Sequence, residues 1–454
     1  MSKMRIAAGS KPGLFLLCRR SAAATVRSAA LMLMVALLAG GPVPISAATP
    51  DPVLEWIDVM NTTVLTAGTA PNVTSRVVAL VSASVFDAVN GIDPNFNPLL
   101  VTPNAPHNAS QRAAAIQAAY TMLLHLYPTQ NVALTSRRDA SLAALALKEK
   151  ADAIAAGVSW GQMVADAIWT VRLTDGFAPP APPFIGVQGI VGTPAVGFWR
   201  PTPPANAFGA TPQIATMTPW VLRRPSQFRL PAPLALSSQE YANDLNEVRS
   251  MGSLLSTTRS SDQSEFALFW ALNTPLAWNR VASQISAARG LTLTENAHLF
   301  ALLNVTLSDA LIACWDTKYR YVFWRPITAI RAGLTPADAD PLWEPWLDHL
   351  TGTPAHPEYP SAHSSMSGAA AFILAAEFGE NTTFTVTSEI LPGTQRSFSN
   401  FSDATAEIAD ARVFGGIHFR TSCVRANGLG RAVADYVSRH ALRARGDDLG
   451  DEQN

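Results

Sequence analysis

Helical periodicity runs through most of this chain, and it limits the available folds more than any other sequence feature. In the segment SRVVALVSASVFDAVNG, valines recur at helical spacing, namely Val78, Val81, Val85 and Val89. Such spacing gives a helix one apolar face for burial. Strand signals are scarce, because no run of alternating β-branched residues bounded by hairpin turns is found. The sequence therefore predicts an all-α fold.

The predicted helices form two groups separated by a proline-rich stretch. Helical segments are expected at 52–93 (with a loop), 109–127, 130–175, 237–251, 259–273, 294–324, 361–379 and 403–445. Residues 176–236 hold 13 of the 33 prolines. An irregular segment of this length is a linker or a functional wall, and its aromatic side chains favour packing over disorder. We expect an N-terminal bundle at 49–175, a connecting segment at 176–236 and a C-terminal bundle at 237–446.

The first 48 residues have a composition of their own. They carry six basic residues and no acidic one, followed by the apolar run SAALMLMVALLAGG and the small residues of PISAA. This order is typical of a secretory signal peptide, cleaved near Ala48, and the pair Arg19-Arg20 suggests twin-arginine export. An uncleaved membrane anchor is the alternative. We expect a periplasmic or secreted protein.

Charge and cysteine content narrow the partners. Without the first 48 residues, 27 basic and 34 acidic residues remain, a net charge of −7, which disfavours nucleic acid as a partner. No later apolar run approaches 18 residues, so no membrane contact is expected after signal cleavage. Residues 447–454 form an acidic tail. Cys314 and Cys423 could form one disulfide, but the sequence does not require it. The sequence does not determine the oligomeric state.

Three short motifs concentrate cations and histidines. In KYRYVFWRP, Lys318 and Arg325 are seven residues apart, so on one helix they share a face, and Pro326 would end or kink that helix. A solvated stripe of surface cations is the plainer interpretation of this motif alone.

The second motif is HPEYPSAH. Ser361 is suited to cap the apolar helix that follows, which would place the N–H groups near Ala362 and His363 at a helix N-terminus, where anions are favoured. An ordinary cap is the alternative. In the third motif, ARVFGGIHFR, Arg412 and His418 would lie about 120° apart on one helix, but Gly415-Gly416 allows a bend that lets them converge.

Together the motifs supply the groups that bind a tetrahedral or trigonal-bipyramidal oxyanion. Arginine binds such an anion bidentately and lysine binds it as a point charge. One histidine can bond to the central atom while the other moves protons. Paired catalytic carboxylates, a Walker loop and zinc-ligand spacings are missing from the sequence.

The order K-x6-RP, PS-x-H and R-x5-H resembles the signature of the type-2 phosphatidic acid phosphatase superfamily. Further stretches, GFWRPTPPA, RSSDQSEFALFW and RVFGGIHF, are similar to its vanadium chloroperoxidase branch, so the resemblance spans most of residues 50–445. It implies a fold of two helical bundles and vanadate as the cofactor. It also implies that hydrogen peroxide and a halide are the substrates and hypohalous acid the product.

The same resemblance assigns roles to residues. The vanadate oxygens would be held by Lys318, Arg325, Ser361, the amide of Ala362, and Arg412. His418 would be the covalent ligand to vanadium, and His363 would be the acid–base residue. At the position of His356, chloroperoxidases tend to have phenylalanine and bromoperoxidases histidine. We therefore expect oxidation of bromide or iodide, with His356 a third catalytic residue; the alternative is that His356 only caps a turn.

Three positions depart from the family pattern: Ala362 replaces a usual glycine, Ala411 a frequent serine, and Ser422 a frequent aspartate. The sequence therefore does not identify the acid that would orient His418. The candidates are Asp262, Asp309, Asp316 and Asp410.

Two other functions remain open. One is an acid phosphatase with the same pocket, in which His418 attacks phosphorus and His363 protonates the leaving group. The other is a non-catalytic secreted binding protein with a degraded pocket.

Overall fold

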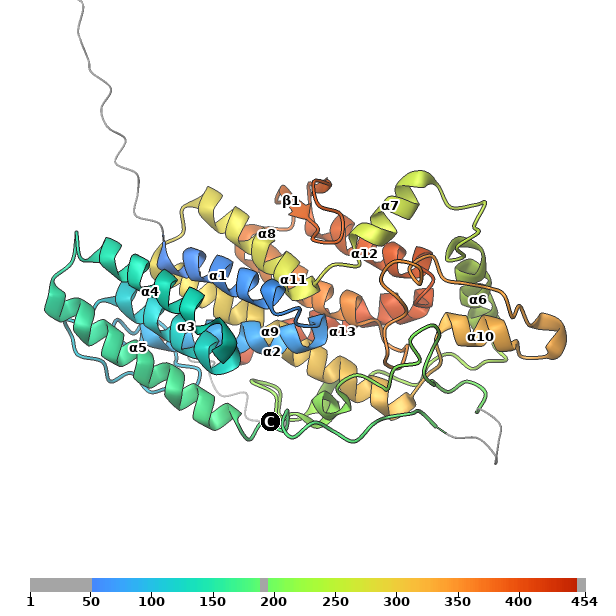
Figure 1. The fold of residues 1–454 in the computed structure, drawn as a ribbon, viewed down its shortest axis with the longest axis horizontal. Coiled ribbons are helices and arrows are strands. Elements are labelled where there is room, and N and C mark those ends of the chain that lie inside the picture. Colours follow the sequence, from blue (N-terminus) through green and yellow to red (C-terminus); the bar gives the residue numbers. More distant parts are fainter. Residues whose placement is uncertain (1–50, 188–194, 447–454) are drawn as a thin grey trace, which may run out of the picture. The chain divides into compact units, whose positions relative to one another are not determined.

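The long helix α9 (Leu293–Tyr321) is the element around which the other helices are arranged (Figure 1). A capping box fixes its start, because Thr292 accepts from the amide of Glu295 while the Glu295 side chain accepts from Thr292. Helix α9 packs against α2 (Pro71–Asn90), α11 (Ala362–Phe378) and α13 (Arg420–His440). This computed structural model describes residues 51–187 and 195–446.

The N-terminal helices lie together at one end of α9 (Figure 1). Besides α2 they are α1 (Pro52–Thr66), α3 (Gln111–Leu126), α4 (Asn131–Leu145) and α5 (Ala151–Arg172), with the short 3-10 turn η1 (Pro128–Gln130). Helix α2 is buried over most of its length and contacts α3, α5 and α9. The predicted helices at 52–93 and 109–127 are confirmed, and the segment 130–175 contains two helices.

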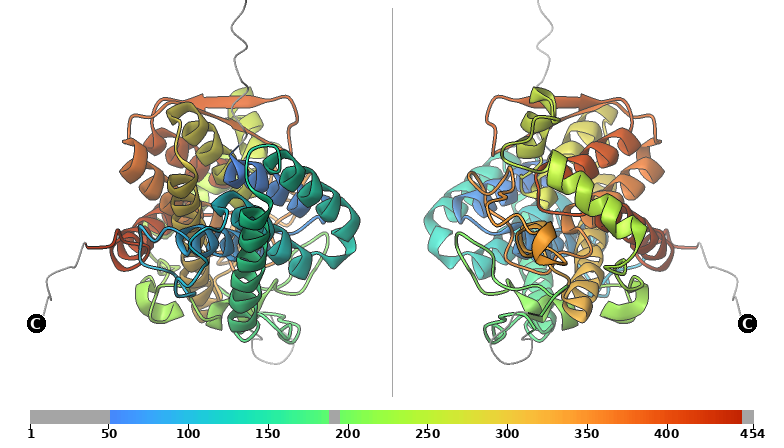
Figure 2. Two further views of the ribbon diagram at one scale, coloured as in Figure 1. Left: turned by 90° about the vertical axis from the view of Figure 1, so that its left-hand side faces the viewer. Right: turned by 90° about the vertical axis from the view of Figure 1, so that its right-hand side faces the viewer.

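The C-terminal part contains elements that the sequence pattern did not predict. Its other helices are α6 (Gln239–Met251), α7 (Ser261–Phe269), α8 (Thr274–Arg289), α10 (Pro326–Ala332) and α12 (Phe401–Phe414), with the 3-10 turn η4 (Pro336–Asp338). Helices α8 and α10 were missed, although each begins with proline in its first turn. A hairpin of β1 (Phe384–Thr387) and β2 (Gln395–Phe398) lies at the edge of the unit (Figure 2). The mostly helical fold is confirmed, but the expectation of no hairpin was wrong.

Small residues bring α11 and α13 into close contact. A Cβ atom on Gly430 would clash with the carbonyl oxygen of Ser365, and one on Gly368 would clash with the backbone of Asn427. Glycine at both positions therefore lets the two backbones approach one another. This contact fixes the start of α11 relative to the chain that leads into α13, and both segments carry predicted site residues.

The proline-rich segment packs against α9. Asp309, which is fully buried on α9, accepts hydrogen bonds from the amides of Trp220, Val221 and Leu222 at 2.7, 2.8 and 3.0 Å. Trp199 of the same segment is also fully buried. The segment further contains η2 (Pro212–Thr216) and η3 (Pro225–Phe228), both of which contact α9. Its described part is therefore a packed wall.

We expect Asp309→Ala to lower the free energy of unfolding by about 2–5 kcal/mol, because three buried amides lose their acceptor. Burial raises the pKa of Asp309 to about 6, so removing the carboxylate also relieves a desolvation cost and limits the loss. Denaturant titration measures the effect, with Asp139→Ala on exposed α4 as the matched control. Equal stability of Asp309→Ala and the control would show that the segment is held mainly by its apolar contacts.

Helices α2 and α9 have the length and hydropathy of membrane spans, but 89% of each apolar window is buried inside the protein. They are therefore core helices of the described part of the chain. The expected division into two bundles stays a prediction. The predicted signal peptide and acidic tail lie outside the described residues.

Candidate functional site

The second and third motifs line one cavity of about 310 Å³, and the first motif lies behind its wall. Five of the predicted site residues line it: His356, Ala362, His363, Arg412 and His418. Its wall is otherwise largely apolar and includes Ala271, Leu311, Trp315 and Met366. The remaining three predicted residues, Lys318, Arg325 and Ser361, are fully buried directly behind this lining.

Lys318 and Arg325 reach the site from two elements. The prediction that they share one face of one helix was wrong, because α9 ends at Tyr321 and Val322 has a left-handed backbone with φ 50°. Arg325 instead precedes α10, and Pro326 begins that helix. Proline suits this first position because it needs no amide hydrogen there. Both cations still reach the second motif, because Arg325 donates to the carbonyl of His356 and Lys318 donates to the next two carbonyls.

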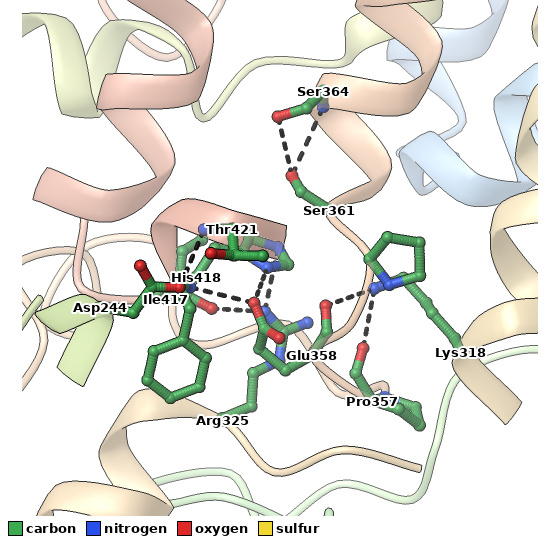
Figure 3. A network of polar contacts seen from close by, with 12 residues as sticks. Asp244, Lys318, Arg325, Pro357, Glu358, Ser361, Ser364, Ile417, His418 and Thr421 are labelled. Carbon is green, nitrogen blue, oxygen red and sulfur yellow. Dashed lines mark hydrogen bonds and ion pairs between the residues drawn. The ribbon is translucent and has the colours of Figure 1, made fainter. Parts of the chain in front are cut away.

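Lys318 is held by two backbone carbonyls of the second motif. Its Nζ donates to the oxygens of Pro357 at 2.8 Å and Glu358 at 2.9 Å (Figure 3). Burial lowers the pKa of Lys318 to about 7. An anion close to Nζ would favour the charged form and oppose that shift.

Arg325 contacts two of the predicted histidines. Its Nη1 lies 3.2 Å from Nε2 of His418, and its Nη2 lies 3.0 Å from Nδ1 of His356. A guanidinium only donates, so both imidazole nitrogens act as acceptors. Burial lowers the pKa of Arg325 to about 10, which keeps the group charged near neutral pH. The His356 ring also contacts Trp315, with ring centroids 4.9 Å apart.

The second motif forms a helix N-terminus, as predicted. Ser361 caps α11, and its hydroxyl accepts from the amide of Ser364 at 3.4 Å. The amides of Ala362 and His363 lie in the first turn, where no intrahelical acceptor exists, so they can donate to an anion. Nε2 of His363 lies 3.2 Å from the carbonyl oxygen of Leu272 and therefore donates to it, which leaves Nδ1 as the acceptor.

The glycine pair bends the third motif as expected. Helix α12 ends at Phe414, Gly416 has φ 79°, and α13 begins at Arg420. Arg412 and His418 thus both reach the cavity. Arg412 donates from Nη1 to the carbonyl of Trp270 at 2.9 Å, whereas its buried Nε has no hydrogen-bond partner among the described residues.

Glu358 orients His418. Its Oε1 accepts from Nδ1 of His418 at 2.7 Å and from the amide of Phe419 at 3.1 Å (Figure 3). This contact fixes the proton on Nδ1 and leaves the lone pair on Nε2, the form in which imidazole binds a metal. Burial lowers the pKa of His418 well below its usual value, and the neighbouring cations add to the shift.

The prediction that one of four aspartates orients His418 was wrong, because each of these aspartates has another partner. Asp309 binds the backbone of the proline-rich segment, and the others form ion pairs: Asp262 with Arg396, Asp316 with Arg229, and Asp410 with Arg420. The sequence did contain the signal, since Glu358 is the one acid within HPEYPSAH. Ser422, at the frequent aspartate position, lines a small cavity of about 10 Å³ together with Glu358.

Cys314 and Cys423 are both buried and free, so the disulfide that the sequence left open is not formed. Burial raises the pKa of the two thiols to about 11 and about 12. Both therefore remain protonated near neutral pH. Neither lines the cavity.

The charge balance of the site favours an oxyanion. Lys318, Arg325 and Arg412 are almost wholly buried, and within the described ranges none of them forms an ion pair with an acid. Glu358 raises the pKa of Lys318 and Arg325, but no carboxylate does so for Arg412. Buried charge is costly without a counter-charge. The unpartnered Nε of Arg412, the free helix amides and Nε2 of His418 together fit vanadate.

The family model for the second helical-bundle domain of vanadium chloroperoxidase (VCPO) matches residues 298–447, which contain all three motifs. Vanadium chloroperoxidase of Curvularia inaequalis is 29% identical over 184 residues. That alignment covers 35% of this chain and 30% of the fungal protein, well under two thirds of its length.

Solved structures extend the likeness to nearly the whole chain. A bacterial vanadium-dependent iodoperoxidase is 27% identical, with a TM-score of 0.77, and the match covers 87% of this chain and 98% of that one. A bacterial vanadium-dependent chloroperoxidase without its cofactor shares the fold, with a TM-score of 0.64 at 20% identity, over 82% of this chain and 95% of that one. The three motifs and these matches make the chain similar to vanadium haloperoxidases in its site residues and in its fold.

Proposed function

We propose that this protein is a vanadate-dependent haloperoxidase that oxidises iodide or bromide with hydrogen peroxide to hypohalous acid. The observation that carries the proposal is the tautomer of His418: Glu358 holds the proton on Nδ1, and Nε2 is left as a ligand atom among three buried cations. When bound, vanadate would supply activation of hydrogen peroxide toward halide without a change in the oxidation state of vanadium.

The residues of this chain would divide the remaining work. Lys318, Arg325 and Arg412 would balance the charge of vanadate, and the amides that open α11 would donate to its oxygens. His363 is suited to accept a proton at Nδ1, because its Nε2–H is engaged by Leu272. Burial and the nearby Arg412 lower the pKa of His363, so the resting ring is neutral and able to act as a base.

The halide choice is supported by His356 and by the likeness to the iodoperoxidase. His356 lines the cavity, contacts Trp315 and accepts from Arg325. A neutral imidazole at this position adds a polar group to a largely apolar wall. Phenylalanine there would keep the ring contact but remove the acceptor for Arg325.

His356→Phe is expected to change the preference between iodide and chloride by about tenfold in kcat/KM, the scale of one lost hydrogen bond to a charged group. The measurement compares the two halides at fixed peroxide and vanadate. His349→Phe is a matched control, since His349 is exposed and also contacts a tryptophan, Trp346, at 4.8 Å. If the ratio of kcat/KM for iodide and chloride does not change, His356 has only the structural role of capping a turn.

The function is tested by adding orthovanadate to protein freed of metal and following oxidation of iodide, bromide and chloride by peroxide. Hydrolysis of p-nitrophenyl phosphate is measured in parallel. Halide oxidation that saturates with vanadate supports the proposal. Phosphate hydrolysis that vanadate inhibits, without halide oxidation, would favour the acid phosphatase instead. Folded protein with neither activity would favour the binding protein.

We also propose that the protein is exported, on the strength of the signal-like residues 1–48. Fractionation of expressing cells tests this, with amino-terminal sequencing of the recovered protein. Cleavage near Ala48 in an extracytoplasmic fraction is the expected result, and an intact N-terminus in the cytoplasm would contradict it.

A further inference from the structure

Met366 lies one helical turn beyond the predicted acid–base residue. It follows His363 by three positions and Ala362 by four on α11, and residues at these spacings share a face of a helix. All three residues line the 310 Å³ cavity. Met366 is only 1% exposed, so it is shielded from bulk solvent and only a small part of its side chain faces the cavity.

The other sulfur atoms near the site are placed differently. Cys314 and Cys423 flank Ser361 but do not line the cavity, and burial raises the pKa of both thiols. Oxidation of cysteine proceeds through the thiolate, whereas a thioether is oxidised without prior ionisation. Of these three residues, Met366 is the one that lines the cavity in which the oxidant would form.

We propose that Met366 is a self-oxidation site, where hypohalous acid made in the cavity converts the thioether to a sulfoxide before it escapes. This inference rests on the proposed function, which supplies the oxidant. The hypohalous acid transfers its oxygen to sulfur and its oxygen–halogen bond breaks. Sulfur loses two electrons, the halogen leaves as halide with both of them, and the proton goes to solvent.

The product alters the wall of the site. A sulfoxide is polar and chiral, whereas the cavity wall to which Met366 belongs is largely apolar. An unpaired polar group in such a wall is unfavourable, so the wall must rearrange or take in water. Because Met366 is next to His363 on α11, the rearrangement reaches the acid–base residue. Activity is then lost in proportion to turnovers completed.

The methionines of this chain supply internal controls. Met163 on α5 is 50% exposed and reports oxidant in bulk solvent, whereas Met122 on α3 is fully buried away from the cavity. The vanadate-loaded full chain is run through increasing turnovers with iodide or bromide, with and without a thioether attached to a soluble polymer too large for the cavity. Peptide mass spectrometry then follows one added oxygen at each methionine.

With the polymer present, Met366 should gain oxygen in step with turnover while Met163 is protected and Met122 unchanged. Met366→Leu, a substitution of similar volume, should raise the total turnovers before inactivation several-fold, and Met163→Leu should not. The inference is overturned if halide is oxidised and Met366 stays unmodified, if the polymer protects it, or if it oxidises equally fast without halide. Absence of halide oxidation would overturn the proposed function and this inference together. If Met366→Leu does not fold, mass spectrometry of the unsubstituted protein still tests the proposal.

Discussion

Replacing His418 with alanine is expected to abolish vanadate-dependent halide oxidation. Its imidazole presents an unprotonated Nε2 next to Arg325, and a hydrogen bond from Nδ1 to Glu358 at 2.7 Å fixes this form of the ring. Loss of a partner behind a metal ligand already costs about 10–100-fold in affinity or activity. Loss of the ligand itself should exceed this range.

The loss should be visible in binding as well as in turnover. Equilibrium dialysis with orthovanadate measures the affinity directly, and iodide oxidation measures activity at saturating vanadate. His440→Ala is a suitable control, because His440 is exposed at the end of α13, away from the site cavity, and stacks on Tyr436 of its own helix. If His418→Ala binds vanadate as tightly as the control variant does, His418 is not the vanadium ligand.

The sequence predicted the residues of the site better than their supports. Each predicted residue belongs to a short motif whose chemistry is local: a cap, a helix start, a pair of cations. The structure places these residues at one cavity or behind its lining, namely Lys318, Arg325, Ser361, His363, Arg412 and His418. Their roles toward vanadate stay predictions. The common helix face of Lys318 and Arg325 was wrong because periodicity cannot show that α9 stops at Tyr321. Val322 adopts a left-handed backbone, which is uncommon for a β-branched residue and has no sequence signal.

The support for His418 was missed because it comes from another motif. Glu358 and His418 are 60 residues apart in sequence, and only the packing of α11 against α13 brings them together. Ser422 and Glu358 line the same small cavity, so the acid absent from the third motif is supplied by the second. The hairpin β1–β2 was missed for a simpler reason: each strand has four residues, too few to show alternation.

Glu358→Gln is expected to weaken vanadate binding and halide oxidation by about 10–100-fold, the usual cost of losing a residue that orients a metal ligand. If the new amide presents its NH₂ to His418, the imidazole must carry its proton on Nε2. That nitrogen already faces Nη1 of Arg325, which is itself a donor. The ring then has no free lone pair for the metal.

The direction of the change separates positioning from charge. Glu358 favours the charged forms of both Lys318 and Arg325, and Asp348 adds to the effect on Arg325. Removing the charge of Glu358 therefore leaves more positive charge for an anion. If Glu358 acted through charge alone, Glu358→Gln would bind vanadate more tightly. Weaker binding, together with a changed vanadium-51 NMR shift of bound vanadate, would instead identify it as the positioning residue of His418.

Burial raises the pKa of Glu358 to about 7, so the protein should tolerate a neutral glutamine at this position and still fold. Glu344→Gln, at an exposed ion pair with Arg331, controls for loss of a carboxylate.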